Sequence, residues 1–238
     1  MTIISLLESS EYKDWEIISQ DKIIYQGKEY YQIGYKKNRE GEAGLSQTVL
    51  SDISVEDYLW NRIHQCAPVE KLYNEALKEQ KENKNAKKID INLILEKLDS
   101  PNGPEYQSSA SSNFEEGEIV VKLGKTENEM LSSVIFEITN FKQQKLFEKI
   151  DDIEYLKSID ADQYAKETEH IEYNGIQIHH DVIQQAIQTS GWDQEIDEYA
   201  TVLDSWQTFE DYWKERSDDE HAHYYRMEYD LAVIKSKF

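Results

Sequence analysis

The feature that most constrains the fold is a long amphipathic stretch that begins at Thr126. Thr126 and Glu129 match a capping box, in which the hydroxyl and the carboxylate each bind a free amide of the first helical turn. On a helix, at about 100° per residue, apolar side chains then gather on one seam. The seam consists of Met130, Val134, Ile138 and Phe141, with Leu131 and Ile135 beside it. The sequence therefore predicts a long helix that reaches about Ile150.

A polar row lies along one flank of this seam and consists of Ser133, Glu137, Asn140 and Gln144. Glu137 is closest to the apolar side chains, so we expect it to be partly desolvated. Burial would raise its pKa and suit it to general acid–base catalysis. The alternative is that Glu137 extends to solvent or pairs with a structural partner, since perturbed carboxylates are often structural.

Strands are expected in three places. Residues 21–37 are rich in Ile and Tyr around Gln26-Gly27-Lys28, which predicts a hairpin. Residues 118–123 have strand character. Residues 171–178 alternate around Asn174-Gly175, and Asn-Gly is the strongest short-range hairpin signal. We therefore predict a second hairpin there.

Further helices are expected along the rest of the chain. Ser54 caps one that ends near Pro68, and a second follows from about Val69 to Gln80. Shorter helices are predicted around Leu93–Leu98 and at 181–189, the latter closed by Gly191. In the C-terminal region, Trp206, Phe209 and Trp213 have helical spacing, and Ser217 with Glu220 forms another capping box.

These patterns predict an α+β fold, mainly helical, with a long central helix and two or three short β-hairpins or strands. The cluster Ser100-Pro101-Asn102-Gly103-Pro104 and the Ser-rich run after it favour a connector. We predict an N-terminal unit over residues 1–100, a linker over 101–117, and a helical α+β domain over 118–238.

The chain is strongly acidic. Its net charge is −22, from 48 Asp and Glu against 26 Lys and Arg. Nucleic acid and anionic membranes are disfavoured as partners, because binding to them depends on clustered cations. A protein partner with a basic surface is favoured by charge complementarity. The alternative is that the charge serves solubility alone.

A single cysteine, Cys66, excludes an intrachain disulfide and fits a reducing compartment. The N-terminal sequence has no basic region of the kind that begins a classical signal peptide. We expect a cytoplasmic protein, or one that is exported by a non-classical route.

No nucleotide-binding or paired-cysteine motif is found, so the cofactor is unknown. Residues 136–140 (FEITN) occupy the frame of the zinc motif H-E-x-x-H, but Phe136 and Asn140 replace its histidines. Conventional zinc hydrolysis is therefore not expected at this segment.

The run Glu129–Asn140, followed by His223-Tyr224-Tyr225-Arg226, resembles patterns in hydrolase-like effector domains of bacterial polymorphic toxins and injection-system cargo. The resemblance covers about half of the chain. It implies a secreted or injected bacterial protein in which Glu137, Asn140 and a histidine or tyrosine of the C-terminal helix surround one cleft.

Histidines supply the opposite wall of that expected cleft. On a helix, His221 and Tyr225 share a face and Glu228 lies one turn further, whereas His221 and His223 point apart. The candidate catalytic residues are Glu137, Asn140, His221, His223 and Tyr225.

Two other histidine sites stay open as alternatives. A metal held by His179, His180 or Asp181 together with Glu137 is chemically feasible, although adjacent histidines are more often a surface feature. A thiol site at Cys66 with His64 is weaker, because residues two apart on a helix diverge.

Two functions follow from the sequence. The first is an effector-like or accessory protein with a hydrolase-like cleft around Glu137. The second is a non-catalytic acidic interaction protein, such as an immunity protein, inhibitor or assembly subunit, that binds a basic partner.

Overall fold

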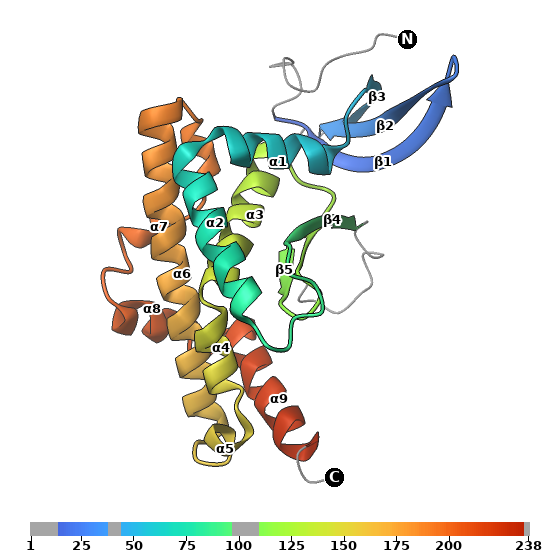
Figure 1. Ribbon diagram of the computed structural model, residues 1–238. Coiled ribbons are helices and arrows are strands. Elements are labelled where there is room, and N and C mark those ends of the chain that lie inside the picture. Colours follow the sequence, from blue (N-terminus) through green and yellow to red (C-terminus); the bar gives the residue numbers. More distant parts are fainter. Residues whose placement is uncertain (1–13, 38–43, 97–109, 236–238) are drawn as a thin grey trace.

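The computed structural model describes residues 14–37, 44–96 and 110–235. It confirms the predicted class: 57% of the protein is helical, and 21% lies in strands that form small sheets. The longest helix of the described residues is α6 (Ala161–Ser190), which runs through the body beside α2 (Ala67–Glu82) and α3 (Glu127–Lys142) (Figure 1). Two small sheets lie on one side of these helices.

The first sheet confirms the predicted hairpin. Strands β1 (Glu16–Tyr25), β2 (Lys28–Lys37) and β3 (Leu45–Ser51) are antiparallel in that order. The hairpin turns at Gln26 and Gly27, whose φ values are 51° and 76°. Positive φ at both turn residues matches the twist of the flanking strands, and a glycine accepts it without strain.

The second sheet has the order β4-β6-β5, with β4 (Asn92–Glu96) parallel and β5 (Ala110–Asn113) antiparallel to β6 (Glu118–Lys122). The strand predicted at 118–123 is confirmed. The short helix predicted at 93–98 is wrong over its described residues, because Leu93 to Glu96 pair with β6. A short apolar run has no period that separates a strand from a buried helix, so the neighbouring strand decides.

Part of the predicted linker belongs to this second sheet. Residues 101–109 lie outside the described residues, and residues 110–113 form β5. The main hydrophobic core contains Ile17, Ile63 and Leu93 from before the linker and Ile138 and Ile183 from after it. Residues from both predicted units therefore pack into one core.

The N-terminal helices follow their predicted capping signals. Ser54 caps α1 (Val55–Gln65), and Pro68 lies in the first turn of α2. The capping box of Thr126 and Glu129 opens α3 as predicted. The expected single helix to Ile150 is interrupted at Gln143, and α4 (Gln144–Ile150) continues from there, followed by α5 (Ile153–Leu156).

The hairpin predicted around Asn174-Gly175 is wrong, because both residues lie inside α6. A Cβ atom at Gly175 would lie 3.1 Å from Gln143 Nε2 and 3.2 Å from Thr139 Oγ1. The glycine thus lets α6 approach the end of α3 closely, and this packing outweighs the local turn preference. The predicted end of the helix is confirmed, since Gly191 caps it with a φ of 67°.

The C-terminal region contains the 3-10 turn η2 (Gln194–Ile196) and helices α7 (Ala200–Leu203), α8 (Phe209–Arg216) and α9 (Glu220–Lys235). Trp206 precedes α8, which is capped by Thr208 and Asp211. The capping box predicted from Ser217 is wrong: Ser217 ends α8, and the Asp219 side chain accepts from the first amides of α9.

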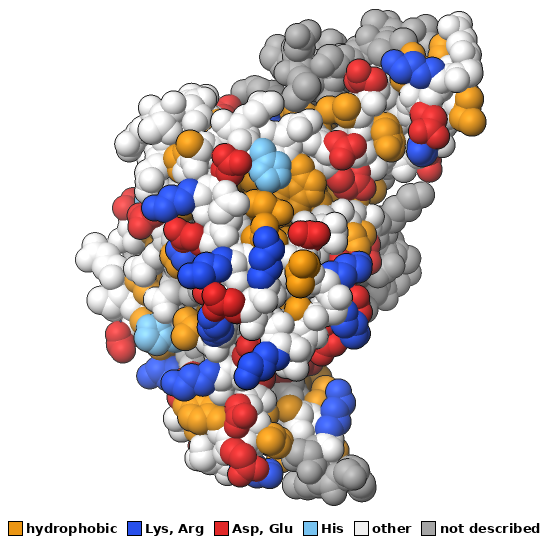
Figure 2. Space-filling model, viewed as in Figure 1, with side chains coloured by type: hydrophobic (Ala, Val, Ile, Leu, Met, Phe, Trp, Pro, Cys, Tyr) orange, Lys and Arg blue, Asp and Glu red, His pale blue; other side chains and the backbone are white. Residues whose placement is uncertain are grey.

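The surface interleaves the two charge signs on the face that carries α2 and α4 (Figure 2). Lys145 lies 2.7 Å from both Glu79 and Glu82, and Lys142 lies 2.8 Å from Glu75. These ion pairs tie α2 to the end of α3 and the start of α4.

Candidate functional site

The polar row of α3 is buried as the sequence predicts. Ser133, Glu137, Asn140 and Gln144 are each 8% exposed or less, and the apolar seam beside them is closed. Seam residues pack into the main core, which fixes the rotation of α3, and Glu137 of the polar row faces Ser112 of β5.

Glu137 is held by two donors. Ser112 of β5 donates its hydroxyl to Glu137 Oε2 at 2.6 Å, and Asn140 donates its amide to the same oxygen at 3.2 Å. Burial raises the pKa of Glu137, and these two hydrogen bonds act in the opposite direction. Asn140 Oδ1 is buried and has no hydrogen-bond partner in the described structure.

Helix α6 adds two buried carboxylates one turn apart, Glu169 and Glu172. Tyr225 of α9 donates its hydroxyl to Glu172 Oε1 at 2.9 Å. Burial raises the pKa of Glu172 to about 7, and the charges of Glu137 and Glu169 add to this effect. Glu137 and Glu169 therefore lie close enough to Glu172 to raise its pKa.

Glu169 is completely buried and both of its oxygens are bound. Tyr212 of α8 donates to Oε2, and His221 Nδ1 lies 2.7 Å from Oε1. Burial lowers the pKa of His221, but the hydrogen bond and charge of Glu169 raise it more, so the net pKa lies above the usual value. The contact with Glu169 therefore favours the protonated form of the imidazole.

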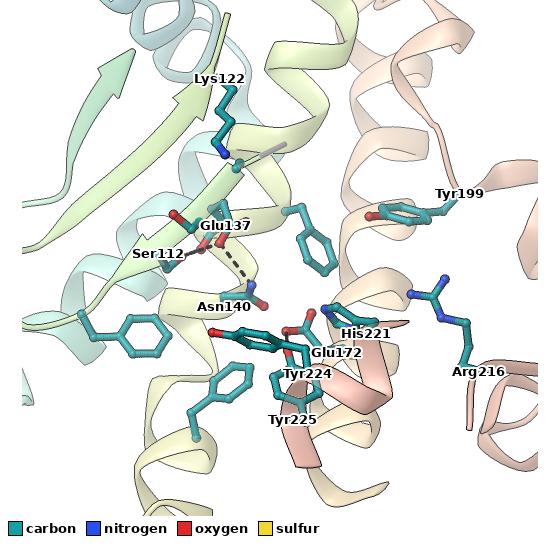
Figure 3. Close-up of a pocket in the computed structure, with 15 residues that line it drawn as sticks. Ser112, Lys122, Glu137, Asn140, Glu172, Tyr199, Arg216, His221, Tyr224 and Tyr225 are labelled. Atoms are coloured by element: carbon teal, nitrogen blue, oxygen red, sulfur yellow. Dashed lines mark hydrogen bonds between the residues drawn. The ribbon is translucent and has the colours of Figure 1, made fainter. Parts of the chain in front are cut away.

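These side chains meet at a pocket of 580 Å³ (Figure 3). Glu137 and Asn140 of α3 lie on one side, and Glu172 and His221 lie toward the other. The charged groups lining it are Lys122, Glu137, Glu172, Arg216 and His221, and the aromatic rings are Phe114, Phe136, Phe147, Tyr199, Tyr224 and Tyr225. The volume is that of a small-molecule site, and the lining combines apolar walls with a few convergent polar groups.

Four of the five predicted catalytic residues line the pocket, and one does not. Glu137, Asn140, His221 and Tyr225 all line the pocket. His223, on the same helix, is exposed and is not among the lining residues. The rings of His221 and Tyr225 lie 4.8 Å apart, as their spacing predicts. Their roles in catalysis stay a prediction.

His179 lies beside the rings of Phe136 and Tyr199 and is not exposed at all. Its Nε2 atom lies 3.0 Å from Ser132 Oγ, which also donates to Glu198. Burial lowers the pKa of His179 to about 4, so its ring is neutral near pH 7. His180 instead lies 2.7 Å from Asp197.

The alternative sites find no support in the described residues, where no group of three or more His, Cys, Asp or Glu side chains is arranged to hold a metal ion. Cys66 is 1% exposed, with its sulfur 3.6 Å from Ser190 Oγ. His64 stacks on Trp60 instead of pairing with this thiol.

Glu169 and Glu172 were not predicted from the sequence, because residues 171–178 were interpreted as a hairpin instead of as part of a helix. The signal was present: Tyr164, Thr168, Glu172, Ile176 and His179 are buried at intervals of three and four residues. Arg216 and Lys122 were also missed, since no spacing links them to the other pocket residues.

Comparison with protein-family models, with curated proteins and with solved structures finds no match for this chain. Among the described residues, no helix combines the length and the apolar character that crossing a bilayer requires.

Proposed function

We propose that this pocket is the active site of a hydrolase-like protein that uses paired carboxyl groups for acid–base catalysis. The observation that supports it is the convergence of Glu137 and Glu172, from two different helices, on one pocket in which burial raises both pKa values. Pairs of carboxyl groups in different environments divide acid and base roles between them.

The different surroundings of Glu137 and Glu172 suggest which of them acts as the base and which as the acid. Glu137 accepts from Ser112 and Asn140, and two donors favour the ionised form. Glu172 accepts from Tyr225 alone and lies near other carboxylates, and its pKa of about 7 suits proton transfer near neutral pH. Glu137 therefore takes a proton from water as the water oxygen bonds to the substrate, and Glu172 gives its proton to the leaving atom.

His221 supplies positive charge beside the reacting atoms. Its Nδ1 atom lies 2.7 Å from Glu169 Oε1, and the ring lines the pocket. An imidazolium fixed in this way stabilises negative charge that develops on a substrate oxygen. Glu169 and Tyr212 are positioning residues, because they hold the imidazole and do not line the pocket.

The biological setting of this proposal comes from the resemblance to effector domains of bacterial polymorphic toxins and injection-system cargo. In that setting the protein is an effector-like or accessory hydrolase. The residues that the resemblance implies, Glu137, Asn140 and a histidine or tyrosine of the C-terminal helix, all have counterparts at the pocket.

The test is hydrolysis in water enriched in heavy oxygen. The full chain is incubated with panels of oligosaccharides, peptides and esters, and mass spectrometry detects products that have gained the heavy isotope. We expect labelled product with the wild type, and a loss of at least about a hundredfold in Glu137→Gln and Glu172→Gln, the range of a general acid or base.

Glu195→Gln is the matched control, because Glu195 is exposed and lies away from the pocket lining. It should keep wild-type activity. Absence of labelled product across the panels, or equal labelling by Glu172→Gln and the wild type, would contradict the proposal.

The second candidate is a non-catalytic acidic interaction protein with a basic partner. The observation that favours it is the net charge of −22, which complements a basic surface. Co-purification from the native host with a basic protein that dissociates as salt rises would support it. Isolation of a lone chain at low salt would count against it.

A further inference from the structure

Helix α9 carries apolar side chains on two faces. One face packs on α6, where Tyr225 bonds Glu172 and Ala222 is buried. The other presents Tyr224, Met227, Leu231 and Ile234, which are 46%, 52%, 47% and 53% exposed. We call these four residues the α9 stripe. An exposed apolar row of this kind on a charged protein marks an interaction site.

The spacing of the α9 stripe identifies the geometry of its partner. Steps of three, four and three residues place Tyr224 and Leu231 at a positions and Met227 and Ile234 at d positions of a heptad. Such a seam packs against a second helix that runs alongside it, knobs into holes. The partner element is therefore a helix.

The charged residues that flank the α9 stripe indicate which helix is its partner. His223 and Asp230 occupy g positions, and Glu228 and Lys235 occupy e positions. In a parallel pair of identical helices, each g residue faces the e residue five positions further along the partner. Asp230 then faces Lys235 of the other copy, and His223 faces Glu228. Asp230 and Lys235 carry opposite charges, and the His223 ring is a hydrogen-bonding partner for the Glu228 carboxylate.

We propose that the α9 stripe pairs in parallel with the α9 stripe of a second copy of this chain. The pairing is weak, since it spans two heptads and since each chain carries a net charge of −22. Tyr224 belongs both to the stripe and to the pocket lining, so the second copy lies at the rim of the pocket. This inference does not depend on the pocket being catalytic.

The test is sedimentation velocity of the full chain at physiological salt, from low micromolar to several hundred micromolar. We expect a concentration-dependent dimer. Leu231→Glu should remain a monomer throughout, because it buries a charge in the seam. Leu146→Glu is the matched control: Leu146 is 46% exposed on α4, and this variant should dimerise like the wild type.

Reversing the charge of a flanking residue distinguishes this specific pairing from the general repulsion between two negatively charged chains. Asp230→Lys reduces the net negative charge, yet it should weaken the dimer several-fold because it places lysine against Lys235. Lys235→Glu should also weaken it, and the double variant should restore wild-type assembly.

Three sedimentation results would overturn the proposal. These are a wild-type chain that stays monomeric, equal behaviour of Leu231→Glu and Leu146→Glu, or a dimer strengthened by Asp230→Lys. Binding of the monomer to neutral phosphatidylcholine vesicles that is lost in Leu231→Glu would assign the stripe to a lipid surface and would also overturn it.

Discussion

Two buried histidines in this protein lie in opposite electrostatic states. His221 faces a pocket and contacts the carboxylate of Glu169, and its pKa lies above the usual value. His179 contacts Ser132 inside the core, and burial lowers its pKa to about 4. Burial acts in the same direction on both rings, so the direct carboxylate partner makes the difference.

The two rings differ in whether a carboxylate contacts the imidazole directly, which is the case for His221 and not for His179. Around His221, three glutamates, four tyrosines and an arginine surround or line the pocket. Around His179, burial keeps the imidazole neutral, and the neighbouring rings are Phe136 and Tyr199, which also line the pocket. We therefore assign chemistry to the first region and packing to the second.

The largest effect is expected from Glu169→Ala. This change leaves His221 and Tyr212 without their acceptor and a cation without its partner, which costs about 3–5 kcal/mol of unfolding free energy. Denaturant titration measures it. Glu167→Ala, on the same helix but only partly buried, should cost about 1 kcal/mol or less. Equal costs would remove the distinction between the regions.

A second effect is expected in the pH dependence of stability. The pKa of Glu172 rises from 4.5 to about 7 on folding, so the folded state holds a proton that the unfolded state releases. The stability gained from this proton is fully present below pH 4.5 and is lost as the pH rises through about 7. Glu172→Gln, which stays neutral, should remove this loss, worth about 3 kcal/mol.

Denaturant titrations at pH 5 and pH 8 measure that effect, with Glu195→Gln as the control. The wild type should lose more stability between the two pH values than Glu172→Gln does. A variant whose loss equals that of the wild type would mean that Glu172 ionises normally.

The smallest effect on stability is expected around His179. Ser132→Ala removes a hydrogen-bond partner from His179 and Glu198, which costs about 1–3 kcal/mol. It should leave the titration of His221 unchanged, because His221 belongs to a different set of contacts. Denaturant titration measures the loss of stability, and histidine NMR measures the titration of His221, whose shifted pKa would show that the two regions are coupled.

The sequence predicted the α3 half of the pocket well. The capping box at Thr126 and the seam period fixed where α3 begins and which way Glu137 and Asn140 point. Helical spacing likewise placed His221 and Tyr225 on one face of α9. Both inferences depended on local periodicity, which a single sequence contains.

The α6 half could not be found in the same way. Asn174-Gly175 is a strong local turn signal, and only the close approach of Thr139 and Gln143 explains why glycine occurs inside a helix there. Ser112 was assigned to a linker because its donor role depends on β5 pairing with β6. Contacts between distant segments decided both cases.

The central claim is that the pocket holds a carboxyl group that exchanges its proton near neutral pH. The most direct test is a carbon NMR titration of the glutamate carboxyl groups in the full chain. One glutamate should titrate with a pKa of about 7, and its signal should disappear in Glu172→Gln. If every glutamate titrates near the ordinary value of about 4.3, the account of this pocket is wrong.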